Sequence, residues 1–337
     1  MSPAIIADRP TIRKPRELVR TSTARQYECG DARRAISLFG LRQGKRGAPM
    51  KAILVPTENN AAMPSALDTA LLLAQKFGGA IEGFALRPAV ADMVAMDPDA
   101  GLTMVAVKEN DAEMVRQAEE LFRAFMQRHS VRERLDGARG AGAAGAAGAA
   151  PSWTWLKSAP SGHDFVGSYG RVFDVIVLSR PEAEWQSPSM VTLESALFES
   201  GRPVVIAPPA APRSFASNVL IAWNCSTEQA RATAFAMPLL HLAERVTILT
   251  VEGATVPGPS GEEMARSLAI NGIAAEPITM AAGKAGAGET ILTRAAELGC
   301  DLVIKGAYTQ SRLRQMIFGG TTRHILAHAK VPVLMAH

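Results

Sequence analysis

The sequence predicts an α/β protein made of two tandem doubly wound units, each a mainly parallel sheet with helices on both faces. Short apolar runs alternate with longer segments whose apolar residues recur at helical spacing. The same order of segments occurs twice along 337 residues, a length sufficient for two ordinary domains. A proline-rich stretch at 208–212 separates the two copies.

The two copies begin alike. Residues 52–56 predict a first strand that matches 219–223, and residues 81–85 and 246–251 predict the second strands. A helix is predicted between the first two strands of each copy. In the first copy its apolar face comprises Met63, Leu67, Ala70, Leu71, Ala74 and Phe77. The second copy has a less regular helical pattern.

The copies also end alike, but one interval differs in length. Residues 173–177 match 300–304 as fourth strands, and 203–206 match 332–335 as fifth strands. The aspartates of the fourth strands are 127 residues apart and the prolines of the fifth strands 129, whereas the first strands are 167 apart. The first copy therefore carries about 40 additional residues between its first and fourth strands.

These intervals define the expected domains. Residues 50–209 form a first α/β domain, 210–216 a linker and 217–337 a second α/β domain. The Gly- and Ala-rich stretch at 137–151 has little to bury, so we expect a flexible surface loop. We expect residues 1–49 to be a basic, disordered extension that folding does not need, because Met50 stands directly before the first strand.

Basic charge is concentrated at the start of the chain. The net charge is +4 and the pI is near 9.1, but residues 1–49 hold 11 Lys/Arg and 4 Asp/Glu and contribute +7. The remainder carries −3, which argues against a nucleic-acid partner. No apolar run approaches the about 18 residues of a membrane helix. The three cysteines lie far apart, which favours a reducing, cytoplasmic location without disulfides.

The last 37 residues hold the one candidate phosphate site. A fourth strand ends there, and a loop leads to the start of the last helix. The residues suited to a phosphate are Gly306, Gly319, Gly320, Thr321 and Thr322. A helix N-terminus offers unpaired N–H groups and a positive dipole end, and glycines let the backbone approach a ligand. In a doubly wound sheet this loop borders the ligand crevice.

This segment resembles the C-terminal signature of the universal stress protein family. Nucleotide-binding members of that family carry Gly-x2-Gly-x9-Gly-Ser/Thr at this point. The chain has Gly306, then Thr309 in place of the second glycine, then nine residues and Gly319, with Gly320 in place of the hydroxyl residue. The spacing is kept and two residue types are changed. The resemblance covers residues 50–337.

The resemblance implies a fold and a ligand. Each five-stranded sheet should have the order 3-2-1-4-5. The family pairs its fifth strands across a dimer two-fold; a tandem chain can make this pairing internally, and a homodimer also stays open. An adenine nucleotide (ATP, ADP or AMP) would bind in the second domain, with its phosphates at the helix start and its sugar or base near Asn224 and Ser226. Asn224 takes the place of the family's aspartate.

The equivalent stretch of the first copy, residues 179–185, has no glycine pair, and its two acids would repel a phosphate. We therefore expect the first domain to act as a structural partner. Other candidate groups are better explained without a ligand. His324 and His328 have zinc-ligand spacing but fit an exposed helix face, Cys225 fits a packed small residue, and the arginines at 312, 314 and 323 fit solvated charges.

No catalytic residues are predicted, because the chain lacks a nucleophile elbow, a CxxC pair and a Walker-type motif. Three interpretations stay open. The chain is a cytoplasmic stress-response protein that binds a nucleotide; or it is a weak ATPase or a relative of the adenine-nucleotide α-hydrolases; or it is a structural partner-binding module without a ligand. No metal is predicted.

Overall fold

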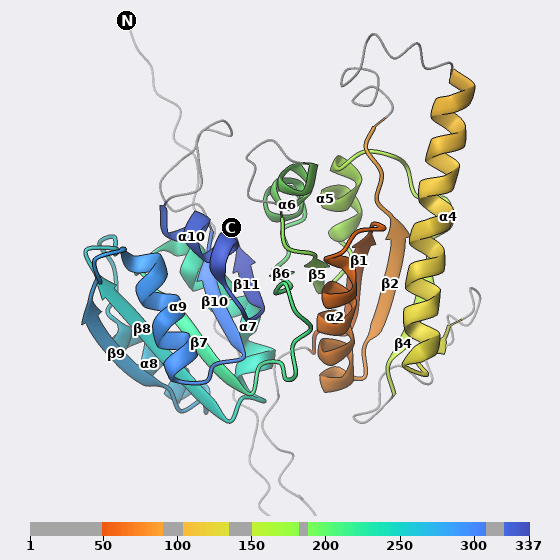
Figure 1. Cartoon of the computed structure of the whole chain (residues 1–337). Helices are drawn as coiled ribbons and strands as arrows, with labels where there is room; N and C mark the ends of the chain where they lie inside the picture. The colour runs from red at the N-terminus through yellow and green to blue at the C-terminus, as the bar shows by residue number, and fades with distance from the viewer. Residues whose placement is uncertain (1–48, 90–103, 135–149, 182–187, 308–319) are drawn as a thin grey trace, which may run out of the picture. The chain divides into compact units, whose positions relative to one another are not determined.

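The chain is represented by a computed structural model that describes residues 49–89, 104–134, 150–181, 188–307 and 320–337 (Figure 1). These residues belong to one compact unit, Arg46–His337. The predicted extension at 1–49 and the predicted loop at 137–151 lie almost wholly outside the described residues, so both stay predictions.

The first half of the chain alternates strands and helices, as the apolar pattern predicts. Its elements are β1 (Ala52–Thr57), α2 (Met63–Phe77), β2 (Ala80–Ala85), α4 (Met104–Arg128), β3 (Arg132–Glu133), β4 (Ser152–Trp155), α5 (Asp164–Gly170), β5 (Val175–Leu178), α6 (Pro188–Glu199) and β6 (Val204–Ile206). The second half repeats the alternation with β7 (Asn218–Trp223), α7 (Thr227–Leu240), β8 (Arg245–Glu252), α8 (Gly261–Ile270), β9 (Glu276–Ala281), α9 (Ala287–Glu297), β10 (Leu302–Gly306), α10 (Gly320–His328) and β11 (Val333–Ala336).

The strands form one sheet in the order β3-β4-β2-β1-β5-β6-β11-β10-β7-β8-β9 (Figure 1). Within each half this is the predicted order 3-2-1-4-5, with parallel neighbours. The first half departs from five strands, because the two-residue β3 adds a sixth beside β4. This strand is exposed and too short to leave an apolar signature.

The two halves are joined by an antiparallel pair of their fifth strands, the internal pairing that the family resemblance allows for a tandem chain. Val333 lies opposite Ile206, and Met335 lies opposite Val204, so β6 and β11 link both sheets. All residues of these two short strands are buried. The pairing satisfies backbone groups that would otherwise form two apolar sheet edges prone to association.

The register of the repeat differs by one residue from the sequence alignment. Ile53 pairs with Val175 on β5, and Val219 pairs with Leu302 on β10. Because Val175 and Leu302 each follow the repeated aspartate, Ile53 corresponds to Val219, whereas the alignment placed Ala52 there. The alignment was wrong because both first strands are apolar on both faces, so alternation does not fix their phase.

The repeated aspartates, Asp174 and Asp301, make equivalent hydrogen bonds in the two halves. Asp174 Oδ2 accepts hydrogen bonds from the backbone N–H groups of residues 51 and 52, both at 2.8 Å. Asp301 Oδ1 accepts from those of residues 217 and 218, at 2.9 and 2.8 Å. Each carboxylate therefore ties the start of the first strand to the start of the fourth.

Replacing Asp301 with alanine is expected to lower the free energy of unfolding by about 2 kcal/mol, because two backbone N–H groups lose a charged acceptor. Asp174→Ala is the matched variant in the first half and should have an effect of similar size. Urea denaturation of both variants measures this. A loss below about 0.5 kcal/mol for either one would show that water replaces the carboxylate.

Side chains alternate along the strands between two apolar layers. One layer, called the α7 layer, contains Ile53 and Ile304 together with residues of α2, α4, α7 and α8. The other, called the α10 layer, contains Leu54 and Val303 together with residues of α5, α6, α9 and α10. Alternate residues of a strand therefore face different helices, and the position of a residue along the strand shows which layer it belongs to.

Candidate functional site

The candidate site lies at the carboxyl ends of β7 and β10. β7 has β8 on one side and β10 on the other, so the direction of strand addition reverses between β7 and β10. Ligand crevices of doubly wound sheets open at such points. The strands' carboxyl ends point up in Figure 1, and α10 begins at this edge because it returns the chain to the parallel strand β11.

At the end of β7 the predicted residues Asn224 and Ser226 form the start of α7. Ser226 is the N-cap, and its Oγ accepts a hydrogen bond of 3.1 Å from the N–H of Gln229. Asn224 Oδ1 accepts one of 3.3 Å from the N–H of Ser226. Between them Cys225 has a φ of 66°, a left-handed conformation uncommon for a residue other than glycine. Both polar side chains thus lie at the predicted edge and already stabilise the helix start.

Gly306, at the end of β10, packs directly against the first turn of α7. A Cβ at this position would lie 2.3 Å from the backbone nitrogen of Gln229 and 2.6 Å from the carbonyl carbon of Glu228. The N–H of Gly306 donates to Gln229 Oε1 at 2.7 Å. The close approach of strand and helix therefore explains this glycine without a ligand.

The start of α10 is open. A Cβ on Gly320 would meet nothing within 4 Å. Thr321 is half-buried and Thr322 is buried in the same turn, while Ile325 and Leu326 anchor the helix in the α10 layer. The structure thus brings Gly320, Thr321 and Thr322 together at this helix start. Gly319 and Thr309 lie outside the described residues, so their predicted contacts with a phosphate stay predictions.

The carboxyl end of α10 is held by the first half. Arg180, which follows β5, donates from Nη1 to the carbonyl of Ala327 at 3.0 Å and from Nη2 to that of Ala329. A guanidinium here neutralises the negative end of the helix dipole and binds carbonyls that the helix leaves unpaired. Burial lowers the pKa of Arg180 from its usual value. The first half therefore positions the helix whose other end is the candidate phosphate site.

Sequence analysis missed one residue at this edge, Lys305. The residue is 4% exposed, and its Nζ donates to the carbonyl of Gly306 at 2.8 Å. Burial lowers the pKa of Lys305 to about 8, and the nearby Glu228 carboxylate partly opposes this shift. The sequence shows only a lysine directly after three strand residues, which does not separate a buried lysine from a solvated one.

The histidine pair, Cys225 and the loop arginines were the other candidate groups in the sequence. The rings of His324 and His328 stack with centroids 4.3 Å apart, and the described residues contain no group of three or more metal-binding side chains. Burial is the main reason that the pKa of the Cys225 thiol is raised, whereas a reactive thiol needs a lowered pKa. Arg312 and Arg314 lie outside the described residues. No helix within the described ranges is long and apolar enough to cross a membrane.

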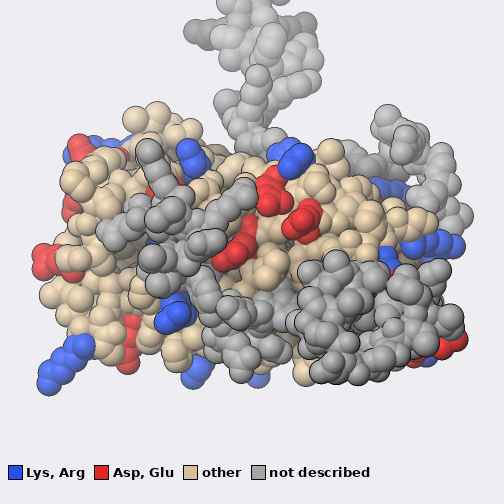
Figure 2. Space-filling view, turned by 90° about the horizontal axis from the view of Figure 1, so that it is seen from above, with Lys and Arg blue, Asp and Glu red and all other residues tan. Residues whose placement is uncertain are grey.

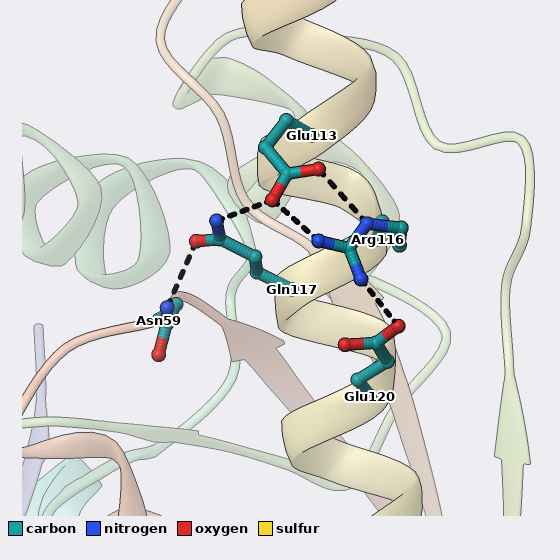
Figure 3. A network of polar contacts seen from close by, with 5 residues as sticks. All are labelled: Asn59, Glu113, Arg116, Gln117 and Glu120. Carbon is teal, nitrogen blue, oxygen red and sulfur yellow. Dashed lines mark hydrogen bonds and ion pairs between the residues drawn. The ribbon is translucent and has the colours of Figure 1, made fainter.

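The first half has a different, acidic edge. Asn59, just after β1, donates to Gln117 Oε1 of α4 at 2.9 Å, and Gln117 donates to Glu113 at 2.6 Å (Figure 3). Arg116 pairs with Glu113 at 2.5 Å and with Glu120 at 2.6 Å. Hydrogen bonds from Arg116 and Gln117 lower the pKa of Glu113 to about 2. The network fixes α4 against the loop after β1 and carries more acidic than basic groups.

The corrected register adds another acid to this edge. β1 and β7 have equal length and aligned starts, so Glu58 in the first half corresponds to Asn224 in the second. Figure 2, which looks onto the carboxyl edge, shows acidic side chains gathered near the middle of the described surface and basic ones scattered around it. An anion at this edge therefore finds little concentrated positive charge on that surface.

Comparison with known proteins finds a family match for the second half of the chain and structural neighbours for most of it. Residues 216–337 match the universal stress protein family. The structure is similar to that of a universal stress protein from Archaeoglobus fulgidus DSM 4304, with a TM-score of 0.59 and 17% identity, over 86% of this chain and 99% of that chain. A protein of unknown function from Pseudomonas aeruginosa PAO1 is also similar, with a TM-score of 0.46 and 15% identity, over 85% of this chain and 92% of that one.

No curated protein matches the sequence. At 17% identity, the likeness to the Archaeoglobus protein establishes the fold: a mainly parallel sheet in two doubly wound halves. The family match rests on the half that carries the strand, loop and helix start of the candidate site. The match to the universal stress protein family covers residues 216–337, the second half of the chain.

Proposed function

We propose that the second half binds an adenine nucleotide, ATP, ADP or AMP, at the carboxyl ends of β7 and β10, as part of a cytoplasmic stress-response role. One observation carries the proposal: the first turn of α10 opens at the switch point of the sheet, with space above Gly320 and the hydroxyl residues Thr321 and Thr322 beside it. The phosphates would accept hydrogen bonds from backbone N–H groups of this turn, which have no partner within the helix itself. The sugar or base would lie near Asn224 and Ser226.

The second candidate function is a structural, partner-binding module without a ligand. It is favoured by a specific observation: Gly306, Asn224 and Ser226 each have a structural role at the junction of β7, β10 and α7. No described group favours the third candidate, an ATPase or a hydrolase of the adenine-nucleotide α-hydrolase type.

Calorimetry of the full chain with ATP, ADP and AMP separates the two candidates. We expect a dissociation constant nearer micromolar than nanomolar, about −8 kcal/mol of binding free energy, since Thr309 replaces the second glycine of the family motif. No measurable binding of any of the three nucleotides would favour the structural module.

Thr321→Asp is expected to weaken nucleotide binding at least about tenfold without loss of stability. A carboxylate in the first turn of α10 repels a phosphate yet favours the helix through its dipole. Thr321→Asn is the matched variant of similar size without charge, and its affinity should stay within about threefold of wild type. Thermal melts of both variants check the fold. Equal affinities for the two variants would place the phosphates elsewhere.

A further inference from the structure

Lys305 is a buried cation in a strand whose other described residues are apolar or glycine. It lies on β10 between Ile304 and Gly306 and is 4% exposed, and within the described part of the chain its Nζ donates one hydrogen bond, to the carbonyl of Gly306. Among the described residues, no carboxylate lies within 4 Å of its Nζ. Buried charges are normally paired, and the described residues give this one no ion pair.

Two observations fix the direction of the side chain. Val303 and Ala307 face the α10 layer, so alternation places Lys305, midway between them, on the same face as α10. Its Nζ bonds the carbonyl of Gly306, the last residue of β10, so the ammonium is turned toward the carboxyl edge. Glu228, in the first turn of α7 at this same edge, acts electrostatically on it.

The N-terminus of α10 opens at this edge and on this face. The helix packs through Ile325 and Leu326 onto the layer that Lys305 enters, and its first turn precedes these residues. The positive end of the helix dipole and the buried ammonium therefore both lie at the carboxyl edge of β10, on the sheet face that α10 covers. This place is called the α10 corner of the second half.

The first half supplies an internal comparison. Leu178 on β5 pairs with Ile206, as Lys305 on β10 pairs with Met335, and both follow the repeated aspartate by four residues. Leu178 is 5% exposed and belongs to the apolar core. The fold thus accepts an apolar side chain at this position, and the charge is not needed to build the sheet.

We propose that Lys305 supplies the interior positive charge for a phosphate group held at the N-terminus of α10. The ligand class is a phosphate-bearing anion, and Lys305 binds it directly through the N–H groups of its ammonium that are not used by Gly306. The inference deepens the proposed nucleotide function and rests on it for the identity of the ligand. The phosphate requirement itself is tested separately with inorganic tripolyphosphate.

Anion binding at Lys305 is linked to proton uptake. A phosphate next to the ammonium raises its pKa, so a partly deprotonated Lys305 takes up a proton on binding, and affinity falls as the pH rises above about 8. The other titratable or charged groups around this corner are Glu228 on α7, His337 after β11, and Arg323 and His324 on α10. Cys225, just before α7 at this edge, carries a thiol whose pKa burial raises from its usual value, so the Lys305 variants are needed to identify the proton uptake that belongs to Lys305.

The test is calorimetry of the full chain with tripolyphosphate and with ATP, at pH 7.5 and pH 9, in two buffers of different ionisation enthalpy. Lys305→Met removes the charge at similar size, and Lys305→Leu introduces the side chain found in the first half. Lys330→Met removes an exposed positive charge just after α10 and serves as the control. Circular dichroism and thermal melts check that each variant folds.

We expect both Lys305 variants to lose about tenfold to a hundredfold in affinity for both ligands at pH 7.5, the size of a charge-assisted hydrogen bond. Their binding should also lose the proton uptake expected for wild type at pH 9. The affinity of Lys330→Met should stay within about twofold of wild type.

Wild-type affinity for ATP in the Lys305 variants would overturn the inference and leave the proposed function standing. Lysine-dependent binding of tripolyphosphate, with adenine nucleotides no tighter, would keep the inference and overturn the nucleotide. Binding of neither ligand to wild type would overturn both.

Discussion

Replacing Gly306 with alanine is expected to lower the free energy of unfolding by about 3 kcal/mol. The new methyl group would lie 2.3 Å from the backbone nitrogen of Gln229 and 2.6 Å from the carbonyl carbon of Glu228. These are backbone atoms in the first turn of α7, so no side-chain rotation relieves the contact. β10 and α7 must move apart, which also stretches the hydrogen bond from Gly306 to Gln229 Oε1.

Gly320→Ala is the matched control, because a Cβ there meets nothing within 4 Å and alanine favours a helix. Its free energy of unfolding should stay within about 0.5 kcal/mol of wild type or rise slightly. Urea denaturation at neutral pH compares the two variants. Equal stability of Gly306→Ala and wild type would mean that β10 and α7 can move apart at little cost. A close approach of a ligand would then be the better explanation for Gly306.

Lys305→Leu is expected to stabilise the protein by about 3 kcal/mol at pH 7. Burial lowers the pKa of Lys305 from 10.5 to about 8, so at neutral pH the folded chain holds a charge in an unfavourable place. Between pH 8 and pH 10.5 the unfolded chain binds more protons at this residue than the folded chain does. Stability of wild type relative to the variant therefore rises through this window, and the deficit is fully present below pH 8.

The measurement is chemical denaturation of wild type and Lys305→Leu at several pH values from 7 to 10.5. Other titrating groups are common to both proteins, so the difference between them isolates Lys305. A constant difference across the window would contradict the buried charge. A fall in stability on removing the charge would mean that the ammonium has a stabilising partner. The expected gain in stability would indicate that the chain retains this lysine for a reason other than folding.

The alternating strands and the repeat could be predicted from the sequence because they depend on apolar periodicity. The Pro-Val sequences at 203–204 and 332–333 located the two fifth strands, and the internal pairing of these strands that the family resemblance allows is confirmed. The register of β1 against β7 could not be predicted, because strands buried on both faces read as continuous apolar runs. β3 could not be predicted because two exposed residues carry no periodic signal.

The site was predictable only in part. Its position at the carboxyl ends of β7 and β10 follows from the order of elements. The reason for each glycine cannot be predicted from the order of elements. Gly306 allows a helix and a strand to pack closely, but a glycine that lets a ligand approach has the same appearance in the sequence. Lys305 was missed because a lysine at the end of a strand is usually a solvated loop residue, and only the structure shows that it is buried. The roles of Gly319 and Thr309 stay predictions.

A nucleotide is proposed to bind in the second half of the chain and not in the first. Photo-crosslinking of the full chain with 8-azido-ATP, followed by peptide mapping, tests it most directly. We predict saturable labelling that unlabelled ATP competes away, with every labelled peptide inside residues 217–337 and loss of labelling in Thr321→Asp. Competed labelling of peptides inside residues 50–209, or the absence of any competed labelling, would contradict the account.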